Sequence, residues 1–165
     1  MQILKMGDDV LRRNSLPIEE ISQDVRTLVD EMFVTLEESG GIGLAAPQVG
    51  QNIRLFIVKL EQEDEGMIFI NPQIIQTSEQ MSTMEEGCLS IPTIYEKVSR
   101  PKEITVQYMD INGKKQLLTT GGLLARVIQH ENDHLNGVLF LDRINETKRE
   151  KAIAKFEKTQ RKVRK

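Results

Sequence analysis

The stretch QHENDH at positions 129–134 constrains this chain more than any other part of the sequence. It contains the spacing His-Glu-x-x-His and holds both histidines of the 165-residue chain. Side chains four positions apart lie on the same face of an α-helix, so His130 and His134 are expected to point at one metal ion. Glu131 lies beside them as a candidate general base. The stretch therefore predicts a metal-binding helix that carries its own proton acceptor.

The residues around this stretch support a helix. Thr119 or Thr120 is expected to cap its start, and Gly137 is expected to end it in the left-handed conformation. Because the same short motif also occurs in ordinary helices, a purely structural role for both histidines stays open from the motif alone. The apolar positions at helical spacing are Leu123, Leu124, Val127, Ile128 and Leu135.

Composition indicates a soluble globular protein of one domain, with 39% hydrophobic and 28% charged residues. No apolar run is long enough to span a membrane, and the first five residues lack the apolar core of a signal peptide. The single cysteine excludes an internal disulfide and fits a reducing cytosol. We therefore expect one catalytic domain over residues 1–165, a cytoplasmic location and no membrane partner.

The basic residues are concentrated at the C-terminal end. Residues 145–165 contain nine Lys and Arg against three Asp and Glu, a balance of +6, which leaves −9 on the rest of the chain. Basic residues alternate there with Ile153 and Phe156, which predicts a helix at about 145–165 with a thin apolar stripe. Light packing against the domain is the simpler interpretation of this helix, and an RNA-binding surface is the alternative.

The remaining elements predict an α+β fold. An amphipathic helix is expected from Ser22, at its N-cap, to Gly40, and strands are expected at 53–59, 67–70, 104–109 and 115–118. The pair Asn71-Pro72 is expected to end the second strand, and residues 110–113 have the composition of a hairpin turn. Several short strands and two strong helices favour antiparallel strands packed around a central metal-binding helix.

Two further stretches have residues suited to a site. Residues 41–50 are small and apolar, and we expect a loop there because Pro47 opposes a helix; its glycines allow close approach of a ligand. Gln48 is the only side chain of this loop with hydrogen-bonding capacity. A lone cysteine such as Cys88 is most often an ordinary buried side chain. However, a catalytic metal commonly has three protein ligands, and the third must be Cys, Asp or Glu because no third histidine exists; Cys88 is the strongest donor.

Together, three segments of the chain resemble the signatures of the peptide deformylases. GIGLAAPQ at 41–48, EGCLS at 86–90 and QHENDH at 129–134 match Gly-x-Gly-x-Ala-Ala-x-Gln, Glu-Gly-Cys-x-Ser and Gln-His-Glu-x-Asp-His in order and spacing. The resemblance implies a metallohydrolase that removes the formyl group from the N-terminal formyl-methionine of newly made proteins and releases formate. It also implies an α+β fold with the motif helix at its centre.

The resemblance implies one divalent metal ion bound by Cys88, His130 and His134. Fe(II) is the expected physiological metal, and Zn, Ni or Co are alternatives that a thiolate and two imidazoles also accept. Glu131 is expected to take a proton from the attacking water and pass it to the leaving amine. The side-chain amide of Gln48, together with a backbone N–H one residue after the cysteine ligand, at Leu89, is expected to stabilise the oxyanion.

Substrate contacts are expected from both flanking segments. Backbone groups of Ile42, Gly43 and Gly87 are expected to pair with the peptide as an added strand. The apolar slot for the methionine side chain is expected between the helix face bearing Leu123 and Val127 and, on the opposite side, Ile42 and Met84.

The resemblance also implies N-formyl-Met nascent peptides as partners, with the ribosome as a further candidate through the basic C-terminal helix; no DNA partner is expected. Beside the metal site, Glu86 is expected to form a buried pair with Arg100.

Two alternative functions remain. A zinc endopeptidase would need a third ligand after the motif, where Asp142 and Glu146 are the only nearby candidates, and an RNA-binding module would carry a degenerate site.

Overall fold

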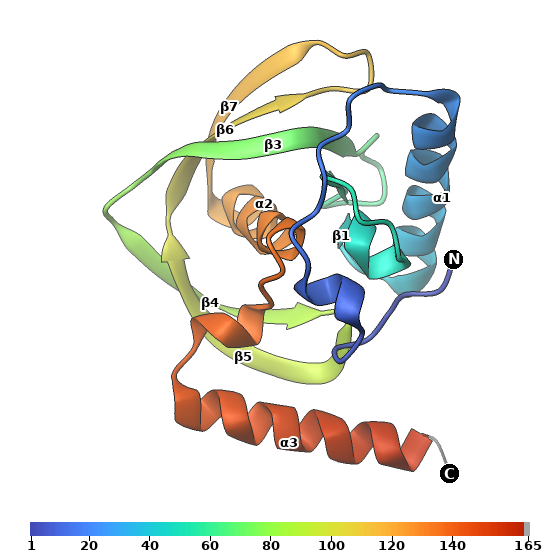
Figure 1. The fold of residues 1–165 in the computed structure, drawn as a ribbon. Helices are drawn as coiled ribbons and strands as arrows, with labels where there is room; N and C mark the ends of the chain where they lie inside the picture. The colour runs from blue at the N-terminus through green and yellow to red at the C-terminus, as the bar shows by residue number, and fades with distance from the viewer. Residues whose placement is uncertain (164–165) are drawn as a thin grey trace.

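The computed structural model describes residues 1–163 and combines three α-helices with two antiparallel sheets (Figure 1). The α-helices are α1 (Gln23–Ser39), α2 (Gly122–Leu135) and α3 (Glu146–Val163), and the 3-10 helices are η1 (Asp9–Arg12), η2 (Ala46–Val49) and η3 (Phe140–Arg143). The strands are β1 (Gly43–Ala45), β2 (Leu55–Val58), β3 (Met67–Thr77), β4 (Met81–Cys88), β5 (Ile91–Pro101), β6 (Glu103–Met109) and β7 (Lys115–Gly121). The large sheet has the order β1-β2-β3-β6-β7, and β4 pairs with β5.

The large sheet lies between α1 and α2, and β2 shows why. Its residues are all buried, and alternate side chains of a strand point to opposite faces. Leu55 and Ile57 join the core formed with α1, whereas Phe56 and Val58 join the core formed with α2. The mixture of helices and antiparallel sheet that the sequence predicted is therefore observed, with helix packing on both faces of the five-stranded sheet.

Helix α1 has the predicted ends. The Ser22 hydroxyl accepts a hydrogen bond from the Val25 N–H at 3.3 Å, and Gly40 ends the helix in the left-handed conformation with a φ of 74°. Its apolar face places Val29, Met32 and Leu36 in the core, and Thr35 is buried beside them.

Helix α2 begins later than predicted, and the prediction of a threonine cap was wrong. Both Thr119 and Thr120 belong to β7, where Thr119 Oγ1 lies 2.8 Å from Thr105 Oγ1 of the neighbouring strand. The N-cap is Gly121, which has no side chain to cap with, because the strand runs directly into the helix. At the other end Gly137 has a φ of 72°, which confirms its left-handed conformation.

Two other local predictions were wrong for related reasons. Asn71-Pro72 does not end β3; the register with β6 shifts at this point, so the pair forms a bulge. A bulge tolerates Pro, which cannot donate to the ladder, and the Asn71 side chain bonds the backbone of Ile18 in both directions at 2.8 Å. Likewise, Pro47 does not prevent helical structure, because it lies in the first turn of η2, where its missing N–H is not needed.

Helix α3 lies below the rest of the molecule in Figure 1, against β5 and η3. Ala152 and Phe156 are its buried residues, and they join a third apolar core that includes Ile91, Val98 and others from β5 and η3. The predicted helix with a thin apolar stripe is confirmed up to residue 163, and the last two predicted positions lie outside the described residues. Over residues 1–163, no helix has both the length and the apolarity to cross a membrane.

Candidate active site

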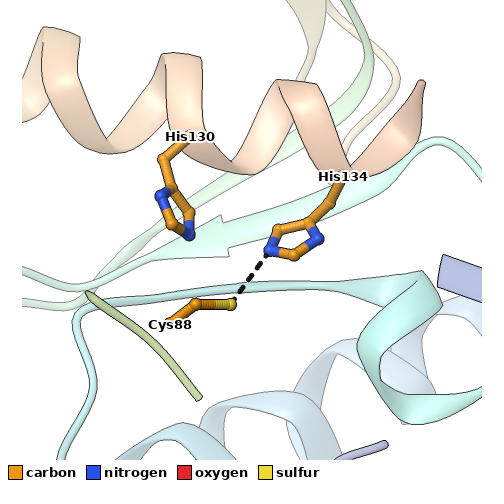
Figure 2. Close-up of side chains that lie close together, drawn as sticks. All are labelled: Cys88, His130 and His134. Atoms are coloured by element: carbon orange, nitrogen blue, oxygen red, sulfur yellow. Dashed lines mark hydrogen bonds between the residues drawn. The ribbon is translucent and has the colours of Figure 1, made fainter. Parts of the chain in front are cut away.

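The two histidines of α2 and Cys88 of β4 come together at one point (Figure 2). Cys88 ends β4 and pairs with Ile91, so Leu89 and Ser90 form the turn between β4 and β5. This turn brings Cys88 Sγ to 3.4 Å from His134 Nε2. The candidate ligand atoms of Cys88, His130 and His134 all lie within 4.8 Å of one another. A thiol and two imidazoles at this spacing are a set that fits a catalytic metal with an open position.

The histidine rings are prepared for such a metal in different ways. His130 Nδ1 lies 2.9 Å from Glu86 Oε1, which fixes the ring and leaves Nε2 free to face Cys88. His134 is 1% exposed, and burial lowers its pKa well below the usual value, so its ring stays neutral, which is the form that ligates metals. Among the described residues, its Nδ1 has no hydrogen-bond partner.

Glu86 is the centre of a buried charge network. It accepts hydrogen bonds from Arg100 Nε at 2.7 Å and Nη2 at 3.0 Å, so the predicted buried pair is confirmed. Burial acts to raise the pKa of Glu86, but the hydrogen bonds from His130 and Arg100 outweigh it and hold the pKa well below its usual range. The carboxylate that orients His130 is therefore kept ionised by its neighbours.

The network extends through residues that sequence reasoning did not assign. Arg126 Nη1 donates to Glu86 Oε2 and to the Val98 carbonyl, both at 2.7 Å. Asp133 accepts from Arg100 at 2.8 Å and from Arg143 at 2.7 Å, so its carboxylate is bound by arginines and is not part of the metal-ligand group. A basic residue within the apolar run 123–128 was the available signal for Arg126.

Glu131 lies inside the site with little solvent contact. It is 2% exposed, its Oε1 is 3.8 Å from His130 Nε2, and its Oε2 has no hydrogen-bond partner among residues 1–163. Burial, the largest cause, raises the pKa of Glu131 to about 7. Gly43 makes room for it, because a Cβ there would lie 3.0 Å from the Glu131 Cγ and 2.9 Å from the Val127 Cγ1. A carboxylate with this pKa is suited to exchange protons near neutral pH.

The Gln48 amide has a defined orientation. Its Oε1 accepts a hydrogen bond from the Ala45 N–H at 2.9 Å, so its NH₂ group must face the opposite side. There Nε2 lies 3.1 Å from Ser90 Oγ and 3.6 Å from Cys88 Sγ. A side-chain donor is therefore held beside the three candidate ligands. Ser90 was not predicted as a site residue, although it is the last residue of the segment EGCLS.

A cavity of about 550 Å³ opens beside these groups. Met84, predicted as one wall of the methionine slot, does not line it and is instead 38% exposed to solvent, because the cavity reaches along β4 only as far as Glu85. His134 is buried behind the lining. The predicted residues that line it are Ile42, Gly43, Gln48, Gly87, Cys88, Leu89, Leu123, Val127, His130 and Glu131.

The ligand arrangement of an endopeptidase is not observed. Asp142 accepts hydrogen bonds from Arg12 and Arg149, and Glu146 is exposed at the start of α3. Across the described part of the chain, the group containing Cys88 is the one in which three such ligand atoms come together.

Comparison with known proteins agrees with this geometry. The model of the polypeptide deformylase family matches residues 1–150. The peptide deformylase of Treponema pallidum is 48% identical over 156 residues, which covers 94% of this chain and 95% of the relative. The peptide deformylase of Rhizobium meliloti is 47% identical over 159 residues, covering 94% and 91%.

Solved structures show the same fold. A peptide deformylase from Synechococcus elongatus in complex with actinonin has a TM-score of 0.90 and 45% identity, with 94% of this chain and 86% of that chain covered. The Legionella pneumophila enzyme has a TM-score of 0.93 and 38% identity, covering 99% and 98%. With its three motifs at one cavity and relatives aligned along nearly its full length, this chain belongs to the peptide deformylase family.

Proposed function

We propose that Cys88, His130 and His134 hold one divalent metal ion at which this chain carries out the reaction of its family. That reaction removes the formyl group from the N-terminal formyl-methionine of new proteins. The observation that carries the proposal is the meeting of three ligand atoms within 4.8 Å beside the buried carboxylate of Glu131. Residues 1–165 act as one catalytic domain in this proposal.

A divalent ion held there supplies Lewis acidity, which polarises the formyl carbonyl and acidifies a water molecule. The donor set accepts Fe(II), Zn, Ni or Co, and we propose Fe(II) as the native metal because of the family resemblance. Metal analysis after anaerobic purification tests this assignment, with Fe expected as the major metal. A protein that contains Zn and is equally active in air would contradict it.

Glu131 carries the proton in the proposed reaction. It accepts a proton from the attacking water and donates it to the departing amine, so one carboxylate acts first as base and then as acid. The pKa of about 7 supports both roles. Gln48 Nε2 and the Leu89 N–H donate hydrogen bonds to the oxygen that becomes negative during attack. The orientation of the Gln48 amide, set by the Ala45 N–H, supports this role.

The cavity supports recognition of an extended formyl-methionyl peptide. The Ile42 carbonyl already accepts a hydrogen bond from the Lys59 N–H at 2.8 Å, which leaves the Ile42 N–H for the substrate. Gly43 and Gly87 bring backbone close to the reacting group, so the peptide can add as a strand. Leu123 and Val127, with Ile42, provide the apolar wall for the methionine side chain.

The decisive experiment measures formate release from a formyl-Met peptide. Steady turnover of this substrate is expected, with little on the acetyl-Met peptide because the reacting group then carries a methyl in place of hydrogen. Casein cleavage in the same preparation would favour an endopeptidase. Absence of formate release from metal-loaded, folded protein would refute the proposal.

A second proposal concerns the ribosome and a cytoplasmic location, where new chains emerge. The supporting observation is that α3 is attached by few buried residues and exposes Lys151, Lys155 and Lys158 to solvent. A basic face of this kind is attracted to RNA with an affinity that falls steeply as salt rises. Changing the three lysines to Gln is expected to weaken cosedimentation with ribosomes at low salt.

A matched control removes the same charge elsewhere. Lys102, Lys114 and Lys115 are exposed residues near β6 and β7, and their replacement by Gln is expected to leave cosedimentation unchanged. Equal effects of both triple variants would mean that net charge, and not α3, governs the interaction.

A further inference from the structure

An extended segment near the N-terminus connects the two sides of the proposed oxyanion site. We name residues 4–6 the N-terminal strap. The Leu4 N–H donates to the Gln48 carbonyl at 2.7 Å, and the Met6 N–H donates to the Ser90 carbonyl at 2.9 Å. Between them, Lys5 Nζ lies 3.3 Å from the Leu89 carbonyl. The strap thus binds η2 with one backbone bond and the β4–β5 turn with the next.

Apolar contacts hold the segment in the same place. Ile3, which precedes the strap, packs on the core that also receives Leu89. Met6 packs on the third core together with Cys88. Ile3 and Lys5 also line the cavity. The segment is therefore part of the wall of the site and not a loose end beside it.

The strap adds two backbone hydrogen bonds to the direct side-chain contact between the two sides. Gln48 and Ser90 are 42 positions apart, and their side chains meet through Gln48 Nε2 and Ser90 Oγ. That bond uses the same NH₂ group that is proposed to donate to the oxyanion. The group has two hydrogens, so one can hold Ser90 while the other donates to the substrate oxygen, and the direct contact between the two sides is then one side-chain hydrogen bond. The bonds of the strap use only backbone carbonyls, so they persist throughout the reaction.

We propose that the N-terminal strap sets the separation of the two oxyanion donors, which makes Leu4 and Met6 positioning residues for formyl hydrolysis. This inference rests on the proposed roles of Gln48 and Leu89. Each backbone bond fixes one donor: Leu4 fixes the residue that carries the side-chain amide, and Met6 fixes the residue after the Leu89 N–H.

Proline substitutions test the strap because proline has no N–H to donate. Leu4→Pro and Met6→Pro are each expected to lower kcat roughly tenfold, a part of the 10²–10³-fold loss that follows removal of a whole oxyanion donor. KM, metal content and the thermal midpoint are expected to change little. The matched control is Gln2→Pro, since the Gln2 N–H makes no hydrogen bond within residues 1–163. Wild-type kcat in both strap variants would overturn the inference.

A double-mutant cycle separates positioning from general damage. In a Gln48→Ala background, Leu4→Pro is expected to cost less than about twofold, because the donor that it positions is already gone. Met6→Pro should keep its full effect in that background, since it acts on the other donor. Independent, multiplying losses for Leu4→Pro and Gln48→Ala would show that the strap does not act through Gln48, and would overturn the assignment of Leu4.

A second form of the experiment covers poor folding of the proline variants. Replacing Leu4 by the corresponding hydroxy acid turns its amide into an ester, which removes the N–H and keeps the side chain. The same tenfold loss and the same cycle with Gln48→Ala are expected. If the wild-type protein releases no formate, the proposed function fails. If it releases formate and the ester variant equals it, only the strap inference fails.

Discussion

Helices α2 and α3 both contain many polar residues, seven of 14 in α2 and 13 of 18 in α3, but they have opposite relations to the fold. Nine of the 14 residues of α2 are buried, among them Arg126, Glu131 and Asp133, whereas two of the 18 residues of α3 are buried. Most charged groups of α2 have partners, whereas those of α3 face water apart from Arg149, which pairs with Asp142. Burial of a charge is costly unless the charge is paired, so α2 depends on other elements to supply partners for its buried charges. Helix α3 needs only a strip of apolar contact.

The sharpest test of this contrast is the one buried charge of α2 that has no close partner. Glu131→Gln preserves the shape of the side chain, so the protein is expected to stay folded and to bind the metal. Its kcat is expected to fall by about 10²–10⁴-fold, since the amide cannot accept the proton. Formate release and metal content measured on the same sample check this. An active variant with full metal content would mean that the proton acceptor lies elsewhere.

The next largest effect, on metal affinity, is expected at Cys88, the proposed metal ligand that β4 contributes beside the two histidines of α2. Cys88→Ser replaces a thiolate by a neutral hydroxyl, which is a far poorer ligand, so metal affinity should fall by more than the roughly 10–100-fold that loss of an outer partner causes. Competition with a chelator measures the change. Unchanged affinity and activity would remove Cys88 from the ligand set.

Breaking the charge network around Glu86 should lower the free energy of unfolding more than it lowers the catalytic rate. Arg100→Met leaves Glu86 and Asp133 without their shared partner, and loss of one member of a buried pair costs roughly 3–5 kcal/mol in the free energy of unfolding. Urea denaturation measures it, and Arg13→Met, at an exposed position, is the control. A double-mutant cycle with Glu86→Gln should show strong coupling, and additive effects would contradict the network.

Loss of a buried side chain in α3 is expected to affect activity less than changes in α2 do. Phe156→Ala removes its largest buried side chain and should cost about 3 kcal/mol, near the low end for a buried phenylalanine, because the terminal helix can shift to fill the space. At a temperature where the protein is folded, kcat/KM for a short formyl peptide should stay within about twofold of wild type. A drop in kcat/KM of roughly tenfold or more in the folded variant would contradict this distinction between the two helices.

The smallest effect is expected from Asp142 in η3, as a change in pH dependence. Burial acts to raise its pKa, but hydrogen bonds from Arg12 and the Leu139 N–H outweigh it and lower the pKa below the usual value. A carboxyl with a lowered folded-state pKa contributes stability above its unfolded pKa of about 3.9 and loses it as pH falls further. In acid titrations of unfolding, Asp142→Asn should therefore show a flatter decline than wild type. Identical slopes would contradict the assignment.

The elements that were predicted correctly are those whose local signals agree with their surroundings. Helix α1 has a serine cap, a regular apolar face and a terminal glycine, so periodicity alone locates it. The sequence did not indicate the bounds of strands β4 and β5, because most residues of β4 are partly or fully exposed and lack an apolar alternation. The bulge at Asn71 shows the same limit, since tertiary bonds to Ile18 decide whether the strand continues.

The site was more predictable than the sheet that builds it. Cys88, His130, His134, Glu131 and Gln48, which the structure brings close together, were singled out from residue chemistry and motif spacing, because each proposed role needs a particular functional group. The exposed position of Met84 was not predicted, since an apolar residue type gives no sign of whether its side chain lines a cavity or contacts solvent. Arg126 was not assigned because its partners, Glu86 and the backbone carbonyls of Ser82 and Val98, are distant in the sequence; its place in an apolar run was the one local signal.

The division of the interior into separate cores has a consequence for the way this protein responds to heat. Val127 and Ile128 of α2 belong to one core, while Cys88 packs on another that is shared with β5, η3 and α3. Adjacent cores can loosen separately, since partial openings need less free energy than complete unfolding. Warming should therefore separate Cys88 from the histidines in a fraction of molecules whose large sheet is still intact. Catalytic inactivation is expected to begin several degrees before the loss of circular dichroism, and amide exchange in β5 should speed up before exchange in β2.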